Sequence, residues 1–253
     1  MENVTINKIP SSFDAFKNLF RADLIVQWRQ RRALLMSVIL PVVFVVSWKG
    51  LIPTIGAAAV LSICIAVALP ATGLMGYSAT IARDRERGVF QRLRTTPISR
   101  WIIMTSRIGV QLAVILFTTL VTYFCAYYFD KISVPFPNLL LVLVAAVVGG
   151  LSFVALGQFI VAFIKSSEGV NAAVRLIYIP LAIVGALGEI GIFGSLVKKI
   201  AVWSPLGTTQ TLLAAAIHPS AITITTLWAL LATLGYGLLF AGIGIAGFEW
   251  STG

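Results

Sequence analysis

Charged residues are scarce in this chain. Lysine, arginine, aspartate and glutamate make up 11% of its 253 residues, whereas a soluble globular domain has about 25%. Hydrophobic residues make up 58%, and the mean hydropathy is +0.96. A chain with so few charges cannot cover a water-facing surface, so the composition excludes a soluble domain and indicates an integral membrane protein.

Residues that carry metal or redox chemistry are also few. The two cysteines, Cys64 and Cys125, fall inside apolar stretches, and no C-x-x-C pair occurs. We interpret them as small buried side chains rather than as a disulfide or a metal site. The single histidine, His218, precedes Pro219 in an expected loop, which favours a structural or solvated role. No G-x-x-x-x-G-K-[ST] motif is present, so this chain carries no P-loop of its own.

The nine acidic residues are too dispersed for an intramembrane enzyme. A protease or lipid transferase of that kind needs paired carboxylates, clustered histidines or a nucleophile with a base at membrane depth. All the acids except Glu189 map to expected loops, helix ends or the N-terminal helix. The sequence therefore disfavours catalysis by this chain.

Six apolar stretches predict transmembrane helices, because the bilayer core of about 30 Å needs about 20 helical residues. We expect one all-α transmembrane domain over 1–253, with a segment at 188–220 that is too polar and too often broken by glycine for a plain span. That segment predicts re-entrant or interfacial helices on the outer side. The six spans are expected at about 33–51, 53–82, 101–129, 138–164, 170–187 and 221–248.

An amphipathic helix is predicted ahead of the first span, at 11–30. Ser11 and Asp14 fit a capping box at its start. Aromatic and aliphatic residues then recur every three or four positions, which indicates one apolar stripe. With basic residues off that stripe, the helix is suited to the cytoplasmic membrane surface. The stripe consists of Phe13, Phe16, Phe20, Leu24 and Trp28.

The distribution of basic residues predicts the orientation. With six spans and both termini in the cytoplasm, 15 of the 19 lysines and arginines lie inside, as the positive-inside rule requires. The net charge of +10 is explained by this topology, so we expect a bilayer and no nucleic acid as its partner.

The longest internal polar run, Arg83–Arg100, separates the second and third spans. It contains six arginines and two acids. Gly88 interrupts it, and Phe90 and Leu93 then lie on one face of a short helix, which Pro97 ends. Charge alone fits a solvated loop equally well, but the apolar face favours a docking surface for a cytoplasmic partner.

Two motifs carry a family resemblance. The run Asp84-Arg85-Glu86-Arg87-Gly88, then Leu93, then Thr96-Pro97-Ile98-Ser99, resembles the cytoplasmic loop of membrane subunits of type-2 ATP-binding-cassette exporters. The family pattern is E-R-E-x-G-T, a leucine and T-P-hydrophobic-S; this chain has Asp84 where Glu is usual and Val89 where Thr is frequent. The pair Pro205-Leu206 resembles a second, less specific family feature before the last span.

In that family the loop carries a coupling helix that receives the motion of the ATPase subunit. The resemblance therefore implies two copies of an ABC ATPase, which would bind ATP and Mg on separate chains, and no cofactor in this chain. It also implies a second copy of this chain or a paralogous permease, and a multi-pass location in a prokaryotic cytoplasmic membrane. The implied ATPase-coupling residues are Asp84, Glu86, Arg87, Gly88, Phe90, Arg92, Leu93 and Pro97.

The cargo is less constrained than the architecture. Apolar walls with few polar groups suit an amphipathic or lipophilic substrate, and the loop resembles the drug and antibiotic branch, which leaves drug, antibiotic, peptide and lipid open. An exporter of polysaccharide or lipid-linked glycan is the alternative, and a passive channel or an intramembrane enzyme is more remote. The export direction is implied by the resemblance alone. The expected substrate path includes Phe44, Thr72, Met75, Tyr178 and Pro180.

Overall fold

Of the helices long enough to cross a membrane in the computed structural model, the rod at Ala57–Glu86 is the most buried, with 78% of an 18-residue apolar stretch covered by the chain. The structure describes residues 11–29, 31–96, 98–188 and 194–247, and within these ranges every regular element is a helix. The expectation of an all-α membrane protein is thereby confirmed. In order, the first half contains α1 (Ser12–Arg29), α2 (Arg31–Trp48), η1 (Lys49–Leu51), α3 (Ile52–Ile55), α4 (Ala57–Pro70), η2 (Ala71–Gly76), α5 (Tyr77–Glu86) and α6 (Val89–Arg94).

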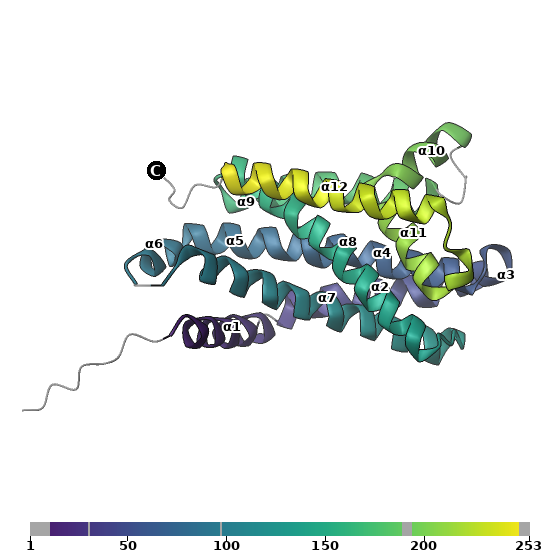
Figure 1. Ribbon diagram of the computed structural model, residues 1–253, viewed down its shortest axis with the longest axis horizontal. Helices are drawn as coiled ribbons and strands as arrows, with labels where there is room; N and C mark the ends of the chain where they lie inside the picture. Colours follow the sequence, from purple (N-terminus) through teal and green to yellow (C-terminus); the bar gives the residue numbers. More distant parts are fainter. Residues whose placement is uncertain (1–10, 30, 97, 189–193, 248–253) are drawn as a thin grey trace, which may run out of the picture.

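The second half supplies the long helices that enclose this rod. They pack against it lengthwise, while α1, α6 and the end of α12 lie at one end of the bundle and α3 and α10 at the other (Figure 1). We name these the α6 end and the α10 end. The elements are α7 (Arg100–Asp130), α8 (Phe136–Phe163), α9 (Ser167–Gly188), α10 (Ser195–Trp203), α11 (Pro205–Ile217), η3 (Pro219–Ala221) and α12 (Ile224–Ala246).

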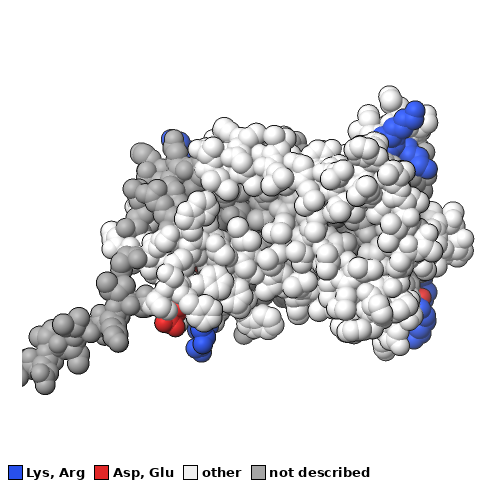
Figure 2. Space-filling model, in the orientation of Figure 1, with Lys and Arg blue, Asp and Glu red and all other residues white. Residues whose placement is uncertain are grey.

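Five described helices are long and apolar enough to cross a membrane. They lie at Ala57–Glu86, Trp101–Asp130, Phe136–Phe163, Ser167–Ala186 and Ile224–Ala246, and the bent pair α10–α11 makes a sixth if it counts as one span. Of the first predicted span, 33–51, the described part belongs to a shorter apolar stretch at Pro41–Ile55. Figure 2 shows charged side chains near the two ends of one face, with a broad uncharged band between them that suits lipid.

The rod is continuous but not uniformly α-helical. Pro70, Gly73 and Gly76 lie near its middle, and the structure has a π-helix at Ala71–Gly76. Proline cannot donate the hydrogen bond that an α-helix needs, and π-turns inside α-helices occur at such breaks. Gln111 of α7 donates a hydrogen bond of 2.7 Å to the Thr72 carbonyl, so the altered backbone remains satisfied in a region without water.

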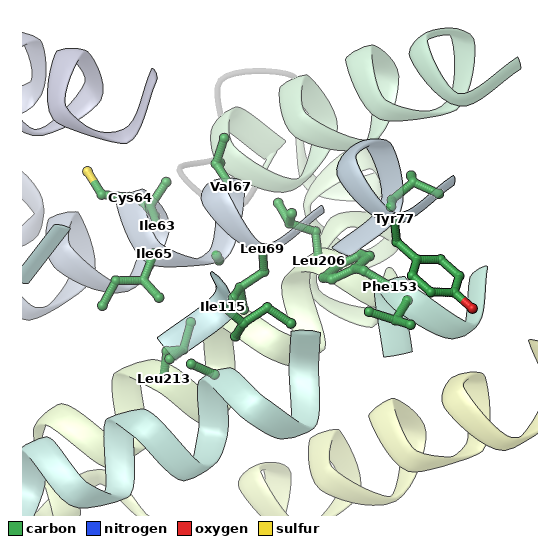
Figure 3. Packing of buried hydrophobic residues seen from close by; sticks show 14 of the residues in the cluster. Ile63, Cys64, Ile65, Val67, Leu69, Tyr77, Ile115, Phe153, Leu206 and Leu213 are labelled. Carbon is green, nitrogen blue, oxygen red and sulfur yellow. The ribbon is translucent and has the colours of Figure 1, made fainter. Parts of the chain in front are cut away.

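The core lies where α4, α7, α8 and α11 meet. Figure 3 shows Leu69, Ile115, Leu206 and Leu213 converging on one cluster, and all four are fully or almost fully buried. Helix α11 enters this core because it follows a 77° bend after α10, where Ser204 caps it by accepting a hydrogen bond from the Gly207 amide at 3.1 Å. The stretch predicted as re-entrant or interfacial thus contains one helix at the bundle surface and one inside; residues 189–193 of it lie outside the described ranges.

Candidate functional site

The polar run between the second and third long helices folds as a helix end, a turn and a short helix. Helix α5 extends to Glu86, so the charged residues Arg83 to Glu86 form its last turn and continue the buried rod. Gly88 then adopts φ 67°, a left-handed conformation that glycine adopts without strain. This turn ends α5, and α6 begins at Val89. Pro97 lies outside the described residues.

Helix α6 turns its apolar face into its own chain. Phe90 is fully buried and belongs to the core cluster, and Leu93 packs against that cluster. The expectation that Phe90 is an exposed contact for a partner is therefore wrong. The periodicity identified the apolar face correctly, but the bundle covers it, because α5 projects beyond the bilayer-facing band and gives α6 a surface to pack on. The exposed residues of this region are polar: Glu86, Arg87, Gln91, Arg92, Thr95 and Thr96.

Arg85 joins the end of α5 to the end of α8. Its side chain is only 3% exposed, and it donates hydrogen bonds to the carbonyls of Val161 at 2.8 Å, Ile164 at 2.5 Å and Lys165 at 2.8 Å. The last carbonyls of a helix have no partners within that helix, and a cation there also opposes the negative end of the helix dipole. The Arg85 guanidinium therefore closes the C-terminus of α8.

Glu86 makes the matching connection to α9. Its carboxylate accepts hydrogen bonds from the Ser167 amide at 2.5 Å and from the Ser167 hydroxyl at 2.7 Å. Ser167 is the first residue of α9, where a negative charge is favourable. Adjacent residues of α5 thus hold both sides of the turn that joins α8 to α9, and we call the contacts of Arg85 and Glu86 the turn clamp.

A second polar cluster connects α5 to α7 and α1. Arg107 pairs with Asp84 at 2.8 Å and with Asp23 at 3.3 Å, and the Ser106 hydroxyl donates to Asp23 at 3.1 Å. Burial raises the pKa of Asp23 from its ordinary value of 3.8; Arg107 and Ser106 oppose this rise, and Asp84 adds to it. The Arg107 guanidinium therefore points into this cluster between α1 and α5.

The N-terminal helix α1 packs alongside α7 and does not lie across the end of the bundle. Its start is capped as predicted, with the Asp14 amide donating to the Ser11 hydroxyl at 3.2 Å. Phe20 lies against Gly109 of α7, and the Trp28 ring contacts Phe117 with centroids 6.4 Å apart. Of the predicted stripe, Phe13 and Trp28 are largely exposed, while Phe16, Phe20 and Leu24 are half-buried.

The predicted path residues come from three neighbouring elements, α2, η2 and α9. Phe44, Met75 and Tyr178 are half-buried and pack against the core, and Pro180 is exposed. Thr72 differs from them: it is buried, and its hydroxyl donates to the Ala68 and Leu69 carbonyls of its own helix. The Thr72 hydroxyl thus donates to carbonyls at the end of α4 and not into a path.

Sequence reasoning missed the role of Arg85, although a signal for it existed. Ser78, Ile81, Ala82 and Arg85 follow the three- and four-residue spacing of one helix face, and all four are buried. An arginine that continues an apolar stripe must find hydrogen-bond acceptors. Ser167 carried no comparable signal, because its partner lies 81 positions away. Among the described residues there is no group of three or more His, Cys, Asp or Glu that could hold a metal ion.

Comparison with known proteins places the chain beside a transporter family. The sequence matches the model of a protein family described as ABC-2 type transporter over residues 14–217, which include most of α1, the turn clamp, the π-helix and α11. A search of curated proteins found no relative that matches the chain.

Proposed function

The chain belongs to the ABC-2 type transporter family, and from this premise we propose that it exports an amphipathic or lipophilic substrate from the cell. As the membrane subunit of an ABC transporter, it works with an ABC ATPase subunit. We place the α6 end in the cytoplasm, where the basic loop meets the positive-inside rule. ATP and Mg would bind to the ATPase, in two copies per transporter.

The observation that carries the coupling role is that α6 packs on α5, whose last turn binds α7, α8 and α9. Arg87, Gln91 and Arg92 face outward, where an ATPase can bind. On the inner side, the turn clamp holds α8 and α9, and Asp84 holds Arg107 of α7. A displacement of α6 and the end of α5 is thereby transmitted to these helices, which is what a coupling element must do.

The second membrane subunit would pack on the faces of α2 and α9. These carry large apolar side chains that the chain leaves uncovered, with exposed fractions of 54% for Val43, 76% for Leu176 and 54% for Ile179. Phe44, Tyr178 and Pro180 lie on the same two helices. Pairing with a second copy or a paralogue would enclose an apolar path there, which supports lipophilic cargo over a highly hydrated glycan.

Charge reversal on the exposed side of α6 tests the coupling role. Exposed charges at an interface rim act mainly on the association rate and its salt dependence. We expect Arg92→Glu to weaken binding of the ATPase up to about fivefold, equivalent to about 1 kcal/mol, and to lower ATP-driven transport. Lys198→Glu, the same change on an exposed lysine of α10 at the opposite end, should alter neither.

The measurements are binding of purified ATPase to the membrane subunit at low and high salt, and transport of a lipophilic fluorescent substrate in proteoliposomes. If Arg92→Glu binds and transports as the wild type does, the exposed side of α6 is not the ATPase-binding surface. Export is supported if the substrate accumulates, with ATP but not with a non-hydrolysable analogue, on the side of the bilayer opposite the ATPase. Transport that needs no ATP would instead support a passive channel.

A further inference from the structure

An open cavity of about 640 Å³ lies between α7, α8 and α12, away from the faces proposed for the second subunit. Tyr77 of α5 contributes to its wall. Both α7 and α12 pack on α8, and the cavity lies between them where several lining side chains are small. These include Ser152, Ala155, Gly237 and Ala241. None of the described residues that line it is charged.

The cavity has the depth of one leaflet. Its wall on α12 extends from Thr233 to Ile245, which corresponds to about 18 Å at 1.5 Å per residue. Half of the bilayer core is about 15 Å. On α7 its lining begins at Trp101, in the first turn of the helix at the α6 end. Trp101 is 70% exposed, and exposed tryptophan is typical of the membrane interface. The cavity therefore extends from the interface at the α6 end toward the bilayer centre.

The surface around the cavity faces hydrocarbon. Leu234, Leu238 and Ile245 line it and have exposed fractions of 45%, 75% and 58%. The helix they belong to is the least covered of the candidate spans, with 17% of an 18-residue stretch buried. An apolar cavity that opens sideways at this depth is filled by lipid tails, since an empty one forfeits the dispersion contacts of its whole lining.

The Gln158 side chain in the wall could hydrogen-bond a lipid but not a plain hydrocarbon. Gln158 is only 7% exposed, and its Oε1 accepts a hydrogen bond of 2.8 Å from the buried Tyr77 hydroxyl. Within the described part of the chain, the structure gives the Gln158 side chain no other hydrogen bond. Its amide nitrogen is thus a donor in the wall of an apolar cavity, and an ester carbonyl is the acceptor that a membrane lipid carries near the top of its acyl chain.

We propose that this cavity binds one acyl chain of a phospholipid from the leaflet at the α6 end, with the Gln158 amide donating to its ester carbonyl. The lipid is a resident of the outer wall of the bundle. It is separate from the cargo, whose proposed path lies on α2 and α9. The proposal depends on the membrane location of these helices and not on the transport function.

A photoreactive lipid tests this in the assembled transporter. The complex is reconstituted with phosphatidylcholine that carries a diazirine in one acyl chain, irradiated, and digested for mass spectrometry. We expect Leu238, in the cavity wall, to be labelled at least fivefold more than Leu239, its exposed neighbour that does not line the cavity. Equal labelling of the two residues would overturn the proposal, because bulk lipid reaches both.

A second experiment fills the cavity with a larger side chain. A Cβ at Gly237 would lie 3.6 Å from Ser152 Cα, an ordinary contact, whereas a Cβ at Gly242 would have nothing within 4 Å. Both glycines are on α12, but only Gly237 lines the cavity. Gly237→Leu should reduce Leu238 labelling about fivefold and Gly242→Leu should leave it unchanged. If Gly237→Leu does not fold, Ala241→Leu fills the same space from the next turn. Unchanged labelling in a folded filled variant contradicts the proposal.

Discussion

The turn clamp gives the sharpest test of how the end of the bundle is held together. Arg85→Met keeps the length and apolar stem of the side chain but removes every donor. The carbonyls of Val161, Ile164 and Lys165 then lose the hydrogen bonds that the guanidinium gave them. Arg87→Met is the matched control, because Arg87 is two positions along, exposed and outside the clamp.

The expected loss follows from how buried each acceptor is. The bond to Val161 is buried, and leaving a buried acceptor without a donor costs about 1–3 kcal/mol. The bonds to Ile164 and Lys165 are only partly buried, so water offsets most of their loss. A total of about 2 kcal/mol corresponds to a fall in Tm of about 4–8 °C for a chain of this size. Arg85→Lys should recover part of it, since an ammonium has donors but lacks the planar fork.

Thermal unfolding of the purified complex in mild detergent, followed by fluorescence-detected size-exclusion chromatography, measures these differences. The same proteins in proteoliposomes report transport per ATP hydrolysed, which should fall in Arg85→Met if the clamp also transmits motion. A Tm for Arg85→Met equal to that of Arg87→Met would refute the inference that the guanidinium stabilises the end of α8.

Three further outcomes are expected. Asp23 has a raised pKa in the folded chain, so its contribution to stability is complete below about its ordinary pKa of 3.8 and is lost as pH rises through the raised pKa. Asp23→Asn should therefore flatten this part of a plot of Tm against pH. An unchanged slope would mean that another group causes the pH dependence. Gly207→Ala would place a Cβ 2.0 Å from the Ala201 carbonyl oxygen, whereas a Cβ at Gly242 would meet open space. Gly207→Ala should therefore lower Tm by several degrees, and Gly242→Ala should not. Equal Tm values for the two variants would contradict the close α10–α11 contact. In a background lacking Cys64 and Cys125, cysteines at Ser133 and Ser220 should react with an impermeant maleimide in intact cells and one at Ser166 should not; the reverse pattern would invert the topology.

The sequence predicted what depends on neighbours along the chain. The helical stretches, the break at Gly88 and the short helix with Phe90 and Leu93 on one face all follow from local spacing, and the structure has them. The spacing could not show what covers that face, because the covering residues come from distant parts of the chain. Phe90 was therefore assigned to a partner when its own bundle buries it.

The polar contacts of the site were beyond sequence reasoning for the same reason. Arg107 meets Asp23 and Asp84, which come from different helices, and Glu86 meets Ser167. Each of these residues alone fits an exposed helix end. Only the crossing of α1, α5 and α7 decides that Arg107 serves two carboxylates, and no local pattern encodes that crossing. Arg85 is the exception, since its register on α5 already indicated burial.

The π-helix at Ala71–Gly76 determines which side chains of α5 face the bundle. Each turn of a π-helix contains about one residue more than an α-turn, so this segment rotates α5 relative to α4 by about 100°, the angle of one α-helical residue. Ile81 and Arg85 face inward only because that rotation is present. Deleting one residue here would leave every span long enough to cross the bilayer, yet it would turn the Arg85 guanidinium away from α8. The length of a six-residue segment in the middle of the rod therefore determines which side of α5 meets the α8–α9 turn, about 15 Å farther along.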